Sequence, residues 1–189
     1  MDAIAINIDF GNLHLVRPCV GYMHSYRAAI YEYCKWAVED FAYPKITTRR
    51  DVAAFLRRTE QFRRGVGVPS GFVPSSAFWL VDGRNYIGSG DVRHFLNSRL
   101  RHLGGNIGYS IRPAAWGRGL GTLQLSMLLH EAKKLHIAKP IITCFDTNAA
   151  SAKVIEKNGG VLLEKRLNQT DDGKNKLTRI YEIDLTKGI

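Results

Sequence analysis

Over residues 120–135 the apolar side chains are spaced by three and four positions, which places them along one face of a helix. Directly before this helix, Ile107–Ile111 alternates large apolar residues with small ones, as a half-buried strand does. Pro113 ends that strand, because proline has no N–H to donate to a neighbouring strand. The chain therefore passes from a strand into a helix through the glycine-rich segment Gly117–Thr122.

The same patterns predict the remaining elements. The segment 21–41 is dense in Tyr, Ala, Glu and Trp, and it predicts a helix with Trp36 near its apolar face. Another helix begins at Thr48, where Asp51 completes an acidic version of the capping box, and the turn 82–85 joins two strands as a hairpin. Strands are predicted over 13–18, 78–81, 86–96, 141–145, 161–167 and 177–185, and a further helix over 151–158. The order predicts one α/β domain over residues 1–189, with a mixed central β-sheet and flanking helices.

The glycine-rich segment predicts an anion site. Backbone N–H groups at the start of a helix are unpaired and lie at the positive end of the helix dipole. Gly117, Gly119 and Gly121 carry no β-carbon, so an anion can approach this backbone closely. No Gly-Lys-Ser/Thr sequence closes the turn, which excludes a P-loop. The sequence also lacks the GxGxxG fingerprint of dinucleotide-binding folds.

Two motifs identify a family resemblance. Trp116–Gly121 resembles the pyrophosphate loop Gln/Arg-x-x-Gly-x-Gly/Ala of the GNAT superfamily of N-acetyltransferases, with Trp116 in place of Gln/Arg. Asn148–Gly160 resembles the next motif of that superfamily, Asn-x-x-Ser followed by an amphipathic helix that ends in Glu-Lys-x-Gly. The similarity to a group of predicted bacterial acetyltransferases extends over Gly71–Leu185, and includes Val73-Pro-Ser-Ser, Arg93-His-Phe-Leu-Asn97 and Gly104–Pro113.

The resemblance implies a fold, a substrate and a reaction. The fold is the GNAT-type (acyl-CoA N-acyltransferase) α/β fold, in which the strands before the loop and after its helix are parallel and splay apart. Acetyl-coenzyme A lies in the resulting cleft and donates its acetyl group to a primary amine, which attacks the thioester directly. No metal is implied. The acceptor is open among small amines, amino acids, antibiotics, and protein termini or lysines.

The resemblance also implies the residues that hold the donor. In the family the strand backbone binds the pantetheine arm, the glycine loop binds the pyrophosphate, and the following motif supplies side chains. Transferred to this sequence, the donor-binding residues are Ser110, Ile111, Arg112, Gly117, Arg118, Gly119, Leu120, Gly121, Thr122, Asn148, Ser151 and Lys157.

The resemblance identifies the catalytic acid and base less fully than the donor-binding residues. Many members of the family place a tyrosine four residues after the position of Ser151, as the acid for the departing thiolate, and here that position is Ile155. Ser151 or water is then the candidate acid. His94 is the candidate base, because the pKa of a histidine lies near the working range. Asp91 on the same strand is the second candidate, and a structural role for His94 is the alternative.

The charge of the chain and its missing tyrosine bear on the alternatives to a transferase. The formal net charge is +10, which suits steering of anionic coenzyme A, attraction of nucleic acid, or a solvated basic surface. The basic clusters lie on separate segments without interleaved aromatic residues, so a nucleic-acid-binding module is the lesser alternative. The missing tyrosine at Ile155 also leaves open a coenzyme A-binding sensor with little catalysis. Homodimer formation is left open.

Cysteine usage and hydropathy bear on location. The three cysteines are scattered and odd in number, which favours free thiols in a reducing cytoplasm, and none has metal-ligand spacing. No apolar run reaches the roughly 18 residues of a membrane span. We therefore expect a cytoplasmic protein.

Overall fold

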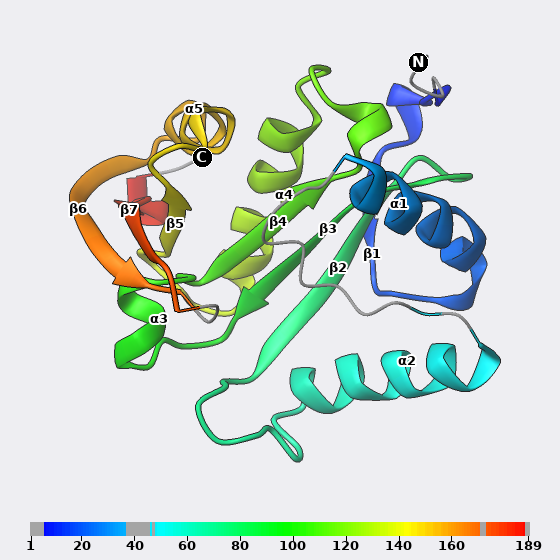
Figure 1. Cartoon of the computed structure of the whole chain (residues 1–189), viewed down its shortest axis with the longest axis horizontal. Coiled ribbons are helices and arrows are strands. Elements are labelled where there is room, and N and C mark those ends of the chain that lie inside the picture. Colours follow the sequence, from blue (N-terminus) through cyan, green and yellow to red (C-terminus); the bar gives the residue numbers. More distant parts are fainter. Residues whose placement is uncertain (1–5, 37–45, 47, 171–172, 188–189) are drawn as a thin grey trace.

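The computed structural model describes residues 6–36, 46, 48–170 and 173–187 (Figure 1). The helices are α1 (Met23–Lys35), α2 (Arg49–Arg63), α3 (Ser98–His102), α4 (Leu120–Lys134) and α5 (Ala149–Lys157). The strands are β1 (His14–Val16), β2 (Ser75–Val81), β3 (Tyr86–Arg93), β4 (Ile107–Ile111), β5 (Ile141–Phe145), β6 (Val161–Gln169) and β7 (Asn175–Glu182).

The strands form two antiparallel sheets that meet at one point. The first sheet has the order β1-β2-β3-β4, and the second has the order β5-β7-β6. They join at the start of β4 and β5, where the Asn106 N–H donates to the Ile141 carbonyl at 2.6 Å and the Ile141 N–H donates to Asn106 Oδ1 at 2.9 Å. This is the expected pair of splayed strands, and the hydrogen-bonded sheet divides between them.

Helices cover both faces of the first sheet. On one face, Trp79 of β2 stacks on Tyr26 of α1 and on Phe55 of α2, with ring centroids 4.8 and 6.0 Å apart (Figure 1). On the other face, Phe78 and Val92 pack with the buried leucines of α4. Alternate residues of β2 and β3 therefore point to opposite helices, and this alternation decides which side chains reach which face of the site.

Local signals are confirmed at several turns and caps. The Thr48 side chain accepts from the Asp51 N–H, and the Asp51 carboxylate accepts from the Thr48 N–H, so the capping box is present. Gly83 has φ +86° in the predicted hairpin between β2 and β3. The β2–β3 register shifts between Leu80 and Val81, opposite Gly88.

Other expectations need correction. Trp36 is 55% exposed rather than part of the core, because the buried face of α1 consists of Met23, Tyr26, Ala29 and Tyr33. The described part of the first helix ends at Lys35, and residues 37–41 of the predicted helix lie outside the described residues. The strand predicted over 86–96 ends at Arg93, where the chain turns toward α3.

The cysteines form no disulfides within the described residues. Cys19, Cys34 and Cys144 are free thiols. None of the helices in the described residues combines the length and apolar character that crossing a bilayer requires. Within the same residues, no group of three or more His, Cys, Asp and Glu side chains is placed to hold a metal ion.

Candidate functional site

The outer edge of β4 carries unpaired backbone groups. The Arg112 N–H donates to the Ile87 carbonyl at 2.9 Å, and the Asn106 carbonyl accepts from the Arg93 N–H at 2.7 Å. Partners in an antiparallel pair alternate between hydrogen-bonded and non-hydrogen-bonded, so Gly108 and Ser110 also face β3. Tyr109 and Ile111 then direct their N–H groups to the outer edge, where no backbone hydrogen bond joins β4 to β5 within the described residues.

The loop after β4 leaves a second set of donors open. Gly117 and Gly119 both have φ +76°, and no atom lies within 4 Å of the place where either β-carbon would stand. Gly119 caps α4, and the N–H groups of Gly119, Leu120 and Gly121 make no hydrogen bond to any described residue. The Thr122 N–H is already used, because it donates to the Gly119 carbonyl at 3.1 Å.

Trp116 fixes this loop to the strand. Its indole N–H donates to the Ile111 carbonyl at 2.6 Å, although the side chain is 48% exposed. The residue that departs from the Gln/Arg of the motif thus supplies a donor inside the protein rather than toward a ligand. The Ile111 carbonyl is consequently occupied, while the Ile111 N–H stays open at the edge of β4.

A cavity of about 610 Å³ joins the loop to the end of α5. Its lining residues are Gly119, Thr122, Leu123, Ser126, Lys157, Asn158, Gly159, Ile183 and Asp184. Asn158 holds the two helices together, because its Nδ2 donates to the Thr122 carbonyl at 3.2 Å and to the Val154 carbonyl at 2.9 Å. The structure therefore brings the predicted residues Gly119, Thr122 and Lys157 to one place, and adds Asn158.

Ser151 lies where the two sheets diverge. Its N–H donates to Asn148 Oδ1 at 2.9 Å, so Asn148 caps α5. The Ser151 hydroxyl is 2.9 Å from the Tyr109 hydroxyl, which reaches across from β4. Burial raises the pKa of Tyr109 far above its ordinary range, so this phenol stays protonated and can donate. Ile155 is fully buried in the core, so no hydroxyl stands at the usual tyrosine position.

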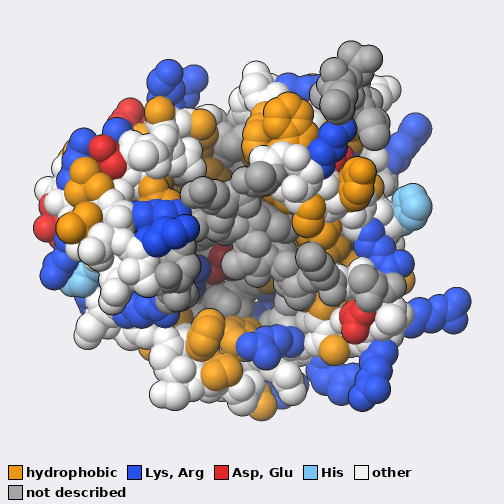
Figure 2. Space-filling view, viewed as in Figure 1, with side chains coloured by type: hydrophobic (Ala, Val, Ile, Leu, Met, Phe, Trp, Pro, Cys, Tyr) orange, Lys and Arg blue, Asp and Glu red, His pale blue; other side chains and the backbone are white. Residues whose placement is uncertain are grey.

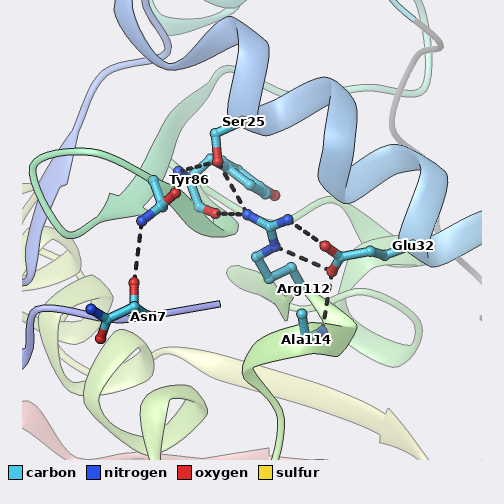
Figure 3. A network of polar contacts seen from close by, with 7 residues as sticks. Asn7, Ser25, Glu32, Tyr86, Arg112 and Ala114 are labelled. Atoms are coloured by element: carbon cyan, nitrogen blue, oxygen red, sulfur yellow. Dashed lines mark hydrogen bonds and ion pairs between the residues drawn. The ribbon is translucent and has the colours of Figure 1, made fainter. Parts of the chain in front are cut away.

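Both predicted arginines bond to other parts of the protein, Arg112 as a buried side chain and Arg118 as an exposed one. The Arg112 side chain points to α1 and pairs with Glu32, and its Nη1 donates to the Tyr86 carbonyl at 3.0 Å (Figure 3). Arg118 Nη1 donates to the Ile6 carbonyl at 3.0 Å. The Arg112 N–H also donates to the Ile87 carbonyl, so neither its backbone N–H nor its guanidinium faces the outer edge. Arg112 therefore positions the end of β4.

His94 and Asp91 lie on opposite faces of the first sheet. His94 Nε2 is 3.0 Å from the hydroxyl of Ser76, on the face that packs against α4. Burial, with the nearby charge of Arg17, lowers the pKa of His94, which keeps the imidazole neutral. Asp91 pairs with Gly108 in the β3–β4 register, on the face covered by α1.

Sequence reasoning missed three contributors to this site. Tyr109 offers both an open N–H and a hydroxyl beside Ser151. Asn158 follows the last residue of α5 and lines the cavity. Glu32, which holds Arg112, lies 80 positions away in the sequence. The alternation of N–H groups along β4 could have indicated Tyr109, but its use requires knowledge of the β3–β4 register.

The basic charge is dispersed on the face that Figure 2 shows. Lys and Arg side chains are spread over both halves of this face rather than gathered into one stripe (Figure 2). Six exposed arginines belong to or flank α2, namely Arg49, Arg50, Arg57, Arg58, Arg63 and Arg64. Glu60 pairs with Arg63 at 2.5 Å within the same helix, and this local pairing is typical of a solvated helix face.

Comparison with known proteins gives a consistent result. A family model described as an acetyltransferase (GNAT) domain matches residues 22–161. The structure of the microcin C7 self-immunity acetyltransferase MccE, in complex with acetyl-CoA and AMP, aligns with a TM-score of 0.70 and 16% identity over 92% of this chain and 93% of that chain. A search of curated proteins gives no match.

Two further structures are ribosomal L7/L12 acetyltransferases. RimL, the ribosomal L7/L12 alpha-N-protein acetyltransferase, in complex with coenzyme A aligns with a TM-score of 0.69 and 15% identity, over 93% of this chain and 96% of that chain. An acetyltransferase from Salmonella typhimurium that modifies the N-terminal serine of L7/L12 aligns with a TM-score of 0.66 and 15% identity, over 92% and 95% of the two chains. At these identities the likeness shows the fold.

Proposed function

The chain belongs to the acetyltransferase (GNAT) domain family, and from this premise we propose that it transfers an acetyl group from acetyl-coenzyme A to a primary amine by direct attack on the thioester. The observation that carries the proposal is the presence of two open donor sets, one on the outer edge of β4 and one at the start of α4. These sets are the Tyr109 and Ile111 N–H groups on β4, and the Gly119, Leu120 and Gly121 N–H groups at the start of α4.

The residues present suit acetyl-coenzyme A as the donor substrate. The pyrophosphate would bind the N–H groups at the start of α4, where the helix dipole and the open glycines favour an anion. Lys157 lines the same cavity and adds positive charge toward the phosphates. The pantetheine amides would pair with the outer edge of β4, as an added strand does.

Ser110–Arg112 divide their tasks along this edge. The Ile111 N–H faces outward and is the donor placed to polarise the thioester carbonyl, where a fixed donor matters most as negative charge develops on the oxygen. The backbone groups of Ser110 and Arg112 face β3, so these two residues act by holding the strand.

The departing sulfur leaves next to Ser151. The amine nitrogen forms a bond to the carbonyl carbon while the carbon–sulfur bond breaks, and the thiolate takes up one proton. Ser151, whose hydroxyl is 2.9 Å from that of Tyr109, can donate that proton, and the proton that the amine nitrogen loses on forming the amide restores the hydroxyl pair. This pair replaces the tyrosine that the position of Ile155 does not supply.

The buried side chain of Ile155 also favours a second candidate function, a coenzyme A-binding sensor with little catalysis. One experiment separates the two functions. The purified protein is incubated with acetyl-coenzyme A and a panel of amines comprising free amino acids, polyamines, aminoglycosides and peptides with free amino termini or lysines. Thiol release with at least one amine, and a mass increase of that amine by one acetyl group, supports the transferase. Binding of acetyl-coenzyme A without thiol release from any amine supports the sensor.

A further inference from the structure

The outermost strand of the second sheet exposes apolar side chains. β6 lies at the edge of the order β5-β7-β6 and pairs with β7 on its inner side (Figure 1). The large apolar side chains of this hairpin that are between 40% and 64% exposed are Val161, Leu162, Leu163, Leu167 and Leu177. An edge strand offers a row of unpaired N–H and C=O groups, which soluble proteins usually cover or guard with charge. An exposed edge with an apolar patch therefore indicates a docking surface for another strand.

The backbone of β6 directs hydrogen-bonding groups away from β7 at alternate residues. In an antiparallel pair, two residues directly opposite each other either bond across or both face away from each other. The Leu177 carbonyl accepts from the Asp146 N–H at the end of β5 at 2.8 Å, so Leu177 faces β5. Its partner Leu167 therefore faces the open edge, as does Lys165 two positions earlier.

One face of β6 carries charges of both signs. Glu164 Oε1 is 3.9 Å and Arg166 Nη1 is 3.3 Å from Nδ1 of His102, which belongs to α3. The two side chains therefore share the face of the hairpin on which α3 lies. Within the described residues Arg166 meets no carboxylate, and Glu164 meets no lysine or arginine. Each can accordingly pair with an opposite charge from another strand.

The other face of β6 carries leucines. Lys165 lies on this face, where its Nζ is 2.8 Å from Asp146 Oδ1, so its charge is compensated within the chain. Leu163 and Leu167 are two positions away from Lys165 on either side, and their side chains point to the same face. They are 54% and 64% exposed. Leu177, the partner of Leu167 on β7, extends this apolar patch.

We propose that the open edge of β6 pairs with the same edge of a second copy of this chain, as antiparallel strands related by a two-fold axis at Lys165. This register sets Leu163 opposite the partner subunit's Leu167, and Glu164 opposite the partner subunit's Arg166. The axis repeats both contacts. Side chains directly opposite in such a pair lie about 5 Å apart at their β-carbons, so the leucines pack and the opposite charges pair.

The self-complementarity of β6 favours a second copy over an unrelated strand. An axis at Glu164 or at Arg166 would instead set like charges opposite each other, which destabilises a pair of strands. An axis at Leu167 would separate Glu164 from the partner subunit's Arg166. Of these registers, the axis at Lys165 alone joins opposite charges and leucines together. The resulting contact is isologous and closed, and it removes the free edge of β6 from both copies.

The test is the mass of the purified full chain in solution, measured by sedimentation equilibrium without any ligand over about 1 to 100 µM. We expect wild-type protein to reach the mass of two chains. Leu167→Arg sets a charge opposite the partner subunit's Leu163, and it should raise the Kd of the dimer by about 100-fold. Val20→Arg is the control, because Val20 is 66% exposed, lies outside the hairpin and receives the same charge. It should dimerise as wild type does.

A charge exchange tests the register. Glu164→Arg sets two arginines opposite each other on both sides of the axis, and we expect the Kd to rise by about 10-fold. Combining Glu164→Arg with Arg166→Glu restores opposite charges across the axis and should bring the Kd back to within about threefold of wild type. Both positions are exposed, so the variants should fold, and their circular dichroism spectra check this.

Three results would overturn the inference. One is a wild-type protein with the mass of a single chain throughout the concentration range, which would leave β6 to a different partner. Another is a dimer that Leu167→Arg leaves intact, or that Val20→Arg weakens equally. The third is a double variant no tighter than Glu164→Arg. None of these measurements involves acetyl transfer, so the inference and the proposed function fail independently.

Discussion

The guanidinium of Arg112 and the carboxylate of Glu32 form a buried bidentate ion pair that joins the end of β4 to α1 (Figure 3). Their side chains are 6% and 14% exposed. Glu32 Oε2 also accepts from the Ala114 N–H at 3.1 Å, and Arg112 Nη1 donates to Ser25 Oγ at 3.1 Å. Because Ala114 begins the connection to the glycine loop, the pair sets the position of that loop relative to α1.

Removing one partner of this pair should destabilise the protein. Glu32→Gln leaves the buried Arg112 charge without its counter-ion, and we expect a loss of about 3 kcal/mol, or roughly 6–12 °C in Tm. Glu131→Gln is the matched control, because Glu131 pairs with Lys134 on the surface of α4, and such a pair contributes about 1 kcal/mol or less. Calorimetric melting compares the two variants. Equal melting temperatures would contradict a structural role for the buried pair.

Two substitutions of similar shape but different charge test whether the glycine loop binds the pyrophosphate. Gly119 has φ +76° and open space beyond it, and Asn and Asp are the side chains that best tolerate such a backbone. We expect Gly119→Asp to fold and to lose measurable binding of acetyl-coenzyme A, because the carboxylate repels the pyrophosphate. Gly119→Asn carries the same backbone strain without the charge and should retain most of the affinity. Wild-type affinity in Gly119→Asp would disprove the assignment of the loop.

Lys157 should contribute a salt-dependent part of the donor affinity. It lines the cavity with Gly119 and Thr122, whereas Lys153, one turn earlier in α5, is exposed and does not line it. For Lys157→Gln we expect binding of acetyl-coenzyme A to weaken by about 3- to 5-fold at low salt, the size of an exposed ion pair. Lys153→Gln changes the net charge equally and should bind as wild type does. Equal weakening by both variants would point to net charge alone.

Asp91 should lower the stability of the folded protein at neutral pH. Burial raises the pKa of Asp91 in the folded state, so its contribution to stability falls as the pH rises from its ordinary pKa to the raised one. Asp91→Asn should therefore melt at a higher temperature than wild type at pH 7, and the gain should vanish below about pH 4. Melting curves across this range provide the measurement. A lower Tm for the variant at pH 7 would show that the ion pair between Asp91 and Arg93, at 3.4 Å, outweighs the cost of burying the carboxylate.

Local sequence was sufficient for the motifs and their elements. The strand 107–111, the glycines at 117, 119 and 121, and the cap at Asn148 each depend on residues within a few positions of one another. Positive φ at Gly117 and Gly119 and the capping box at Thr48 follow from the same short-range chemistry. The family assignment followed from two such motifs in the right order, and the match to residues 22–161 confirms it.

The facing of side chains could not be obtained in the same way. Whether Ser110 or Ile111 offers its N–H to the outer edge depends on the β3–β4 register, and a shift of one residue would exchange them. The placement of His94 and Asp91 on opposite faces depends on which helix covers each face. The Arg112–Glu32 pair joins residues 80 positions apart. Long-range packing decides these three features, and the hydrophobic periodicity of a single segment does not reveal that packing.

Calorimetric titration of the purified protein with acetyl-coenzyme A at low salt tests the central claim most directly, since we propose that both donor sets bind this molecule. The account predicts saturable binding at one site with a micromolar Kd, displaced by free coenzyme A. The absence of saturable binding under these conditions would contradict the assignment of the β4 edge and the glycine loop.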